Sequence, residues 1–200
     1  DNIVFHAIIF PAMLMAHGDF VLPDNIPANE FLNIGGEKFS KSKGNGILVK
    51  DIVEKFNPDI VRYTLATLIP ENKDSEFTWK ELQTKNNSEL AAILGNFINR
   101  TVVFAKSKFE NKIPSGVKTG EADKEILEQF KKSSETVAEF YDTFKFKDAL
   151  METMNAIRAA NKYFNDSEPW KLIKEDKERC EAVINTCLEI CHSIAIMIAP

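Results

Sequence analysis

The sequence has few cysteines, and all of them lie close together. Cys180, Cys187 and Cys191 fall within one short segment near the end of the chain. An odd number of cysteines on one helical segment does not make a disulfide framework, so a small disulfide-stabilised fold is excluded. His192 alone adds too few ligands for a metal site, so no metal is expected in this chain. We therefore expect buried free thiols, which fit the reducing cytoplasm best.

The sequence also has no hydrophobic run of about 18 residues, the length that a transmembrane helix needs. The apolar stretch 3–15 is interrupted by His6 and Pro11, and no basic residues precede it as they would in a signal peptide. We therefore expect a cytoplasmic protein with no membrane partner.

An excess of positive charge is absent as well. The 25 Lys and Arg residues are outnumbered by 30 Asp and Glu residues, which gives a net charge of -5. Binding of nucleic acid by bulk charge is therefore excluded, whereas a local basic site on an acidic body is compatible with this composition. Hydrophobic residues make up 44% of the 200 residues, which excludes disorder and gives room for one large or two small domains. Because the chain begins at Asp1 and ends within the apolar run 193–200, we expect a segment of a longer protein.

Polar and apolar spacing divides the chain into three parts. In residues 1–50 it predicts an apolar helix over about 4–17 and a hairpin over 31–39. Residues 51–77 are expected to form a connector of two short helices followed by a polar loop over 71–77, and Asn57-Pro58 has the residue types that start the second helix.

From residue 78 onward the spacing of apolar residues is helical. Thr78 and Glu81 form a capping box, so a long helix is expected to begin there. Pro169 and Trp170 follow a polar Asp-Ser-Glu run, which predicts a capped start of a short helix. Four main helices with short connections predict a bundle, with expected ranges 78–109, 121–144, 147–164 and 176–199 and a linker over 112–120.

The most informative stretch is a basic loop over residues 38–45. Lys38 and Lys41 are separated by small residues and followed by glycine, so the loop can fold over a polyphosphate. The lysines would stabilise negative charge on departing pyrophosphate, and Ser40 and Ser42 would add hydrogen bonds. The alternative is an ordinary solvated turn, since these residue types are common on surfaces.

The order of these residues resembles the Lys-Met-Ser-Lys-Ser signature of class I aminoacyl-tRNA synthetases, with Phe39 in place of Met. Four other stretches resemble the methionyl-tRNA synthetase family within that class: 5–14, 57–63, 94–100 and 169–170. The resemblance implies a mainly α protein, in which the tail of a Rossmann-like α/β catalytic domain is followed by an α-helical anticodon-binding bundle. The implied domains are the catalytic tail with the signature loop, a helical stem-contact connector and the bundle, at 1–50, 51–77 and 78–200.

The resemblance also implies the function of a methionine–tRNA ligase. Such an enzyme activates methionine with ATP and passes it to methionine tRNA, and magnesium is the expected counter-ion of the ATP. Lys38 and Lys41 would act in catalysis, and both lysines would bind ATP together with Ser40 and Ser42. The family's His-x-Gly-His motif is absent, because His6 is followed by Ala-Ile-Ile. The family's inserted domain, to which any zinc would belong, is absent too, so we expect this chain alone to be inactive.

Six further residues receive binding roles from the resemblance. His6 and Phe10 are four residues apart on the first helix and would line the methionine pocket, although core packing is the ordinary alternative. Asn96 and Arg100 share a helix face and would read anticodon bases, with Asn87 as a weaker candidate; a plain surface pair is the alternative. Trp170 would stack on an anticodon base, or else serve as a core anchor.

Two other functions remain open from the sequence. A sister class I synthetase, for leucine, isoleucine, valine or cysteine, would share the signature loop and a helical bundle. A non-catalytic RNA-binding bundle would use the lysine-rich loop only to bind phosphate backbone. The Asn96 and Arg100 pair together with Pro169-Trp170 favours the methionine family over its sisters.

Overall fold

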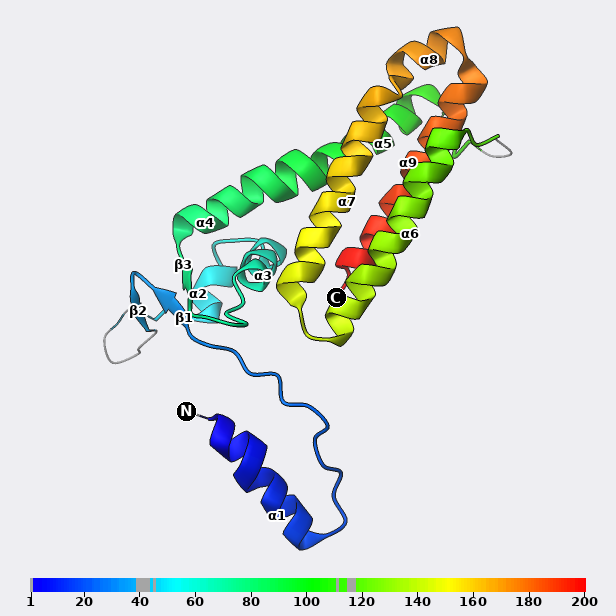
Figure 1. Cartoon of the computed structure of the whole chain (residues 1–200). Coiled ribbons are helices and arrows are strands. Elements are labelled where there is room, and N and C mark those ends of the chain that lie inside the picture. The colour runs from blue at the N-terminus through cyan, green and yellow to red at the C-terminus, as the bar shows by residue number, and fades with distance from the viewer. Residues whose placement is uncertain (1, 39–43, 45, 111, 115–117) are drawn as a thin grey trace.

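The computed structural model describes the whole chain except residues 1, 39–43, 45, 111 and 115–117. Long helices form a bundle at one end, a small mixed unit packs beside it, and the N-terminal helix lies apart from both (Figure 1). The mainly α architecture expected from the sequence is therefore confirmed.

The bundle is built from four long helices and one short one. Their apolar faces meet in one continuous core, which includes Phe97, Phe130, Ile157 and Ile190, each at most 2% exposed. The predicted helices are confirmed to within a few residues, and the bounds are α5 Asn96–Lys108, α6 Glu121–Asp142, α7 Phe146–Asp166, α8 Pro169–Glu175 and α9 Lys177–Ile198.

The first bundle helix is part of a longer rod. It starts with α4, Trp79–Thr84, continues as the π-helix η2, Lys85–Gly95, and ends as α5. The Thr78 side chain accepts a hydrogen bond from the Glu81 backbone N–H at 3.0 Å, as the capping pattern predicts. The long helix expected over 78–109 is therefore confirmed, whereas its π-helical middle was not predicted.

The small unit contains a three-stranded sheet and two short helices. Strands β1, Leu32–Ile34, and β2, Glu37–Lys38, form the predicted antiparallel hairpin. Gly35 and Gly36 form its turn with φ of 60° and 77°, values that suit glycine. The expected polar loop over 71–77 is wrong at its end, because β3, Ser75–Phe77, pairs in parallel with β1.

Helices α2, Val49–Val53, and α3, Pro58–Thr67, share an apolar core with this sheet. The Asn57 side chain caps α3 by accepting a hydrogen bond from the Asp59 N–H at 2.8 Å, as expected from the Asn-Pro pair. Ile52, Val61 and residues of β3 and α4 form a second core, separate from that of the bundle. The small unit thus has a core of its own.

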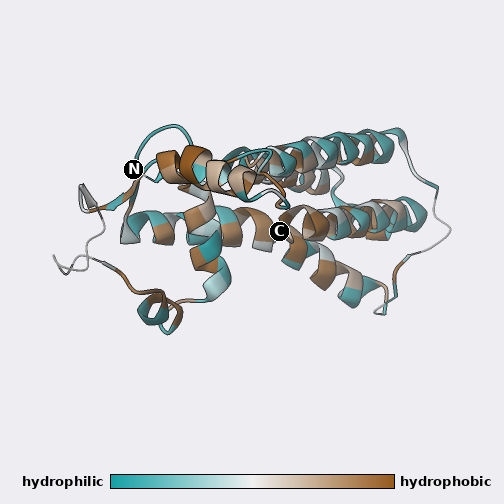
Figure 2. Cartoon of the chain, turned by 90° about the horizontal axis from the view of Figure 1, so that it is seen from below, coloured by the Kyte–Doolittle hydropathy of each residue, from teal (hydrophilic) through white to brown (hydrophobic). Residues whose placement is uncertain are grey.

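The N-terminal helix consists of η1, Phe5–Ile9, and α1, Phe10–His17. It is hydrophobic along most of its length (Figure 2), yet none of its residues is buried. In a π-helix, residues five apart are neighbours, whereas in an α-helix residues four apart are neighbours. The side-chain contacts of this helix therefore differ from those expected for an α-helix. Accordingly Phe10 stacks on Phe5, with ring centroids 6.0 Å apart, while His6 meets the edge of Phe5 at 5.3 Å.

Helix α9 is long and apolar enough to span a membrane by length and composition alone, contrary to the expectation that no segment would qualify. Its apolar face is nevertheless buried in the core of the bundle, since Val183, Ile184 and Ile190 are 0% exposed. Cys180 and Cys187 lie on this face as buried free thiols, and Cys191 is partly buried. Burial raises the pKa of Cys180 and of Cys191 to about 11, so both stay protonated near neutral pH.

Candidate functional site

Asn96, the first residue of α5, is held by an amide on the neighbouring helix α7. Its Nδ2 donates to Asn161 Oδ1 at 3.2 Å. The Asn161 amide nitrogen in turn donates to the backbone carbonyls of Ile93, at 3.0 Å, and Ile157, at 3.2 Å. Because these carbonyls occupy the Asn161 nitrogen, only its oxygen is left to face Asn96. Within the part of the chain that the structure describes, the exposed Asn96 side chain therefore has its own oxygen and one N–H available for a ligand.

Arg100 lies one turn further along α5 and is held from two sides. One guanidinium nitrogen donates to Asn165 Oδ1 at 2.8 Å. The guanidinium carbon lies 4.4 Å from the centroid of the Phe164 ring, a cation–π contact. Such a fixed, planar cation can hydrogen-bond a base edge or stack on a base.

Trp170 extends this surface from the first turn of α8. Its ring lies 6.3 Å from that of Phe164, and the indole is 42% exposed. Phe164 is 3% exposed and its ring contacts both Arg100 and Trp170. We call Asn96, Arg100, Phe164 and Trp170 the aromatic–amide cluster. Its flat, partly exposed groups suit an unstacked base.

The expected side-chain cap at the start of α8 is wrong. Glu168 occupies the capping position with a left-handed φ of 43° and no side-chain cap bond, because its carboxylate pairs with Lys171 at 2.8 Å. Pro169 at the first helical position is buried, as a residue without an N–H can be there. The backbone turn and the buried proline therefore set the direction of α8.

An ion pair between Asp123 and Arg179 joins α6 to α9. Asp123, on α6 and 0% exposed, accepts hydrogen bonds from the Gly120 N–H at 2.7 Å and from Arg179 Nη2 of α9 at 2.7 Å. It also accepts from the Tyr163 hydroxyl of α7. Burial opposes ionisation of Asp123, but these hydrogen bonds outweigh it and lower the pKa of the carboxyl. The network ties α6, α7 and α9 together beside the aromatic–amide cluster.

The other predicted residues that the structure describes are not part of this cluster. Asn87 is exposed on η2, about two turns before Asn96, and its side chain accepts from Asn86 at 2.9 Å. Lys38 ends β2, so the hairpin carries the start of the signature loop. Ser40, Lys41 and Ser42 lie outside the described residues. His6 and Phe10 are exposed on the N-terminal helix.

Two known protein families match this chain. Residues 1–102, just over half of the chain, match the family described as "tRNA synthetases class I (M)". Residues 113–200 match the family described as "Anticodon binding domain of methionyl tRNA ligase". The chain belongs to the class I methionyl-tRNA synthetase family. Asn96 and Arg100 of the aromatic–amide cluster fall within the first match, and Phe164 and Trp170 fall within the second.

Members of the methionyl-tRNA synthetase family match over the entire chain. A methionine–tRNA ligase of Bacteroides fragilis is 45% identical over 202 residues, and one of Salinibacter ruber is 43% identical over 205 residues. A solved structure, Mycobacterium tuberculosis methionyl-tRNA synthetase in complex with methionyl-adenylate, superposes with a TM-score of 0.92 at 31% identity. The chain covers 30% of the Bacteroides protein, 29% of the Salinibacter protein and 40% of the Mycobacterium chain.

These matches support the predicted fold and set aside both alternatives. The sister synthetases are not favoured, because both matching families are those of methionine. A non-catalytic bundle is not favoured either, because the match to the synthetase family begins at residue 1, far ahead of the bundle.

Three residues of the site region were missed from the sequence. Phe164, Asn161 and Asn165 all come from α7 and support the predicted Asn96, Arg100 and Trp170. Asn161 and Asn165 are four residues apart on a predicted helix, the same signal that singled out Asn96 and Arg100. That signal becomes specific only once α7 is known to pack beside α5.

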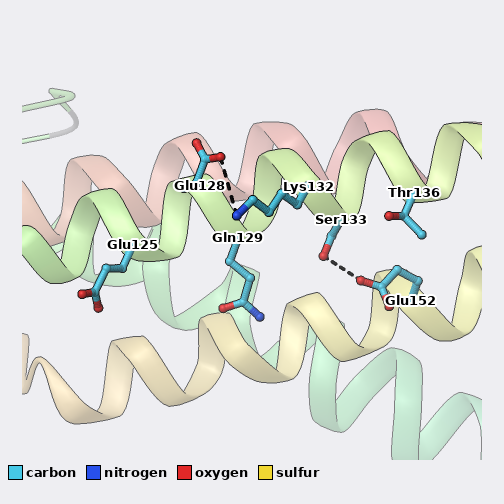
Figure 3. Close-up of a pocket in the computed structure, with 7 residues that line it drawn as sticks. All are labelled: Glu125, Glu128, Gln129, Lys132, Ser133, Thr136 and Glu152. Atoms are coloured by element: carbon cyan, nitrogen blue, oxygen red, sulfur yellow. Dashed lines mark hydrogen bonds and ion pairs between the residues drawn. The ribbon is translucent and has the colours of Figure 1, made fainter.

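A polar groove between α6 and α7 does not resemble a nucleic-acid site. It has a volume of about 500 Å³, and three carboxylates line it, those of Glu125, Glu128 and Glu152 (Figure 3). The Glu152 carboxylate accepts from Ser133 at 2.7 Å. Such a groove repels phosphate. Within the described part of the chain, no group of three or more His, Cys, Asp or Glu side chains is placed to hold a metal.

Proposed function

We propose that this chain forms the end of the catalytic domain and the anticodon-binding domain of a cytoplasmic methionine–tRNA ligase. The aromatic–amide cluster carries the proposal, because it combines an oriented amide, a fixed guanidinium and an exposed indole on one surface. We infer that Asn96 and Arg100 read anticodon bases, that Trp170 stacks on one of them, and that Asn87 contributes at the margin. The proposed division is a catalytic tail over 1–50, a stem-contact connector over 51–77 and the anticodon bundle over 78–200.

The signature loop gives the chain its part in the chemistry. In the proposed reaction the methionine carboxylate attacks the α-phosphate of ATP, so that methionyl adenylate forms and pyrophosphate leaves. Lys38 and Lys41 offset the negative charge that develops on the departing pyrophosphate, and Ser40 and Ser42 donate hydrogen bonds to its oxygens. Magnesium, when bound, adds charge neutralisation on the ATP phosphates. His6 and Phe10 contact the methionine side chain in this proposal.

Titration of the 200-residue chain with an RNA hairpin carrying the methionine anticodon tests the binding half of the proposal. We expect binding that weakens when the anticodon is replaced, because base contacts rather than phosphate contacts provide the discrimination. Arg100→Ala removes one reading group, and Lys131→Ala, on α6, is the matched loss of one positive charge. Equal binding of both hairpins, or equal effects of the two variants, would contradict the proposal.

Kinetics of the full-length ligase test the catalytic half. Lys41→Ala removes a cation directed at charge that develops in the transition state. The rate of methionine activation should fall by roughly 10²–10³, the usual cost of losing one such group. Methionine binding should hardly change. A variant with normal activation but weak methionine binding would contradict the assignment of Lys41.

A further inference from the structure

Helix α3 lies between the two cores of the molecule. Val61 faces the core of the small unit, with Ile52 and Phe77. Tyr63 and Ala66 face the other way and pack into the core of the bundle. The helix therefore joins the unit that carries the β1–β2 hairpin to the bundle that carries the aromatic–amide cluster (Figure 1).

Apolar packing alone leaves this junction incompletely filled. A mainly apolar groove of about 920 Å³ lies between α3 and the bundle, lined among others by Leu65, Leu90 and Leu150. A junction with such a space along it can change its angle more easily than a close-packed core. Hydrogen bonds, which are directional, are then needed to fix the angle of α3 relative to the bundle.

One such contact is a hydrogen bond between Tyr63 of α3 and Glu89 of η2. The Tyr63 hydroxyl donates to Glu89 Oε2 at 2.5 Å, and Lys85 Nζ lies 2.8 Å from Glu89 Oε1. The side chains of Lys85 and Glu89 are only 21% and 22% exposed. Burial opposes the charge of Glu89, but the hydrogen bonds from Lys85 and Tyr63 outweigh it and lower the pKa of this carboxyl. Glu89 is thus a charged acceptor held on both oxygens.

A second hydrogen bond also connects the small unit to the bundle. Glu71, in the loop after α3, accepts a hydrogen bond from the backbone N–H of Lys147 at 3.3 Å. Lys147 is in the first turn of α7, where a carboxylate also interacts favourably with the helix dipole. The small unit is thereby connected to η2 and to α7, the two elements that continue to Asn96 and Asn161.

The position of Glu89 on the rod makes this junction relevant to function. Glu89 precedes Asn96 by seven residues in one uninterrupted helix. The unit that Tyr63 belongs to carries β2, from whose end the signature loop starts. A change of angle at Tyr63 and Glu89 would therefore move the loop relative to the aromatic–amide cluster without altering either site.

We propose that Glu89, through its hydrogen bond from Tyr63, is a positioning residue that sets the angle between the small unit and the anticodon bundle. This inference rests on the proposed function. A transfer RNA bound at its anticodon must present its far end to the catalytic domain, so the angle decides whether that end arrives in place. Binding of an isolated anticodon hairpin needs only the bundle, and activation of methionine needs only the catalytic domain.

The test compares three measurements in the full-length ligase. Tyr63→Phe removes the hydroxyl and keeps the ring that packs in the bundle core. We expect kcat/KM for charging intact methionine tRNA to fall about tenfold, because the acceptor end of the tRNA would be misplaced relative to the catalytic domain. Hairpin affinity and methionine activation should each stay within about twofold of the parent, because neither depends on the angle. Ser133→Ala is the control, since it removes a hydroxyl-to-carboxylate hydrogen bond of 2.7 Å within the bundle.

Substitutions of Glu89 provide the second arm, which remains informative if Tyr63→Phe folds poorly. Glu89→Gln keeps an acceptor for the Tyr63 hydroxyl, so its loss of charging should be smaller than that of Glu89→Ala. Unchanged charging in both the Tyr63 and the Glu89 variants would overturn the inference. A fall in hairpin affinity equal to the fall in charging would also overturn it, because the role would then lie inside the bundle. Absence of hairpin binding by the parent protein would instead refute the proposed function.

Discussion

The two groups of predicted binding residues differ in how the chain holds them. Arg100 is fixed by Asn165 and by the Phe164 ring, and Asn96 is fixed by Asn161. His6 and Phe10 lie on a helix with no buried residue, and each has a ring contact with Phe5 of that same helix. The bundle therefore holds its predicted binding residues in place, whereas the N-terminal helix presents an apolar surface. Similar sequence signals, residues four apart on a helix, thus led to two predicted groups that differ in their contacts to neighbouring helices.

The largest expected effect comes from breaking the Asp123 network that connects α6, α7 and α9. Asp123→Ala leaves Arg179, Tyr163 and the Gly120 N–H without their shared acceptor. We expect the free energy of unfolding to fall by about 3 kcal/mol, the usual cost of removing one partner of a buried pair. Urea denaturation measures this change. A loss below about 0.5 kcal/mol, as at an ordinary surface position, would show that the network does not hold the bundle end.

The pH dependence of stability is a second test of the contribution of Asp123. The pKa of Asp123 is lower in the folded chain than its ordinary value of 3.8. Its contribution is therefore fully present above that value and is lost as the pH falls below it toward the folded pKa. Urea denaturation between pH 7 and pH 3 should show a steeper loss of stability for the parent than for Asp123→Asn. Identical slopes would exclude Asp123 as a source of the acid sensitivity.

Trp170→Ala tests whether the exposed indole binds RNA or anchors the core. Because the ring is 42% exposed, we expect a small change in melting temperature. Binding of the anticodon hairpin should weaken by about 1–3 kcal/mol, the usual value of one base–aromatic stack. Thermal melting and hairpin titration measure the two effects separately. A much lower melting temperature with normal binding by the folded variant would assign Trp170 to the core instead.

Asn161→Ala is expected to have a smaller effect on binding. It leaves Asn96 in place but removes the acceptor that orients its amide. Hairpin affinity should fall by about 1 kcal/mol, the net value of one hydrogen bond. Discrimination against a changed anticodon should fall with it, because a freely rotating amide presents donor and acceptor equally. Unchanged discrimination would show that Asn96 does not depend on Asn161.

The smallest effect is expected for a substitution on the N-terminal helix. Phe10→Ala should change the free energy of unfolding of this chain by less than about 0.5 kcal/mol, because the ring is exposed and leaves no core cavity. Hairpin affinity should stay the same. Calorimetry and the same titration provide the measurements. A loss above about 1 kcal/mol would mean that the N-terminal helix packs on the rest of the chain and would remove the contrast.

Local signals in the sequence determined the helices, the hairpin and the family. Thr78 and Asn57 cap helices where their patterns predict, and Gly35-Gly36 turns the hairpin, because capping and turn formation depend on residues only a few positions apart. Asn96, Arg100 and Trp170 were chosen from the resemblance to the family, and the chain does bring them onto one surface. The signature loop was recognised from the order of its residues alone.

Contacts between distant residues were decided only by the tertiary structure. Strand β3 was missed because Ser75–Phe77 is short and polar, and it is a strand only through its pairing with β1 some forty residues earlier. The support of Arg100 by Phe164 and Asn165, and the hydrogen bond from Tyr63 to Glu89, depend on which helix faces which. Periodicity tells which face of a helix is buried, but not against which partner, because every apolar face gains similar free energy from leaving water. The pairing of these faces is set by packing of the whole chain at once.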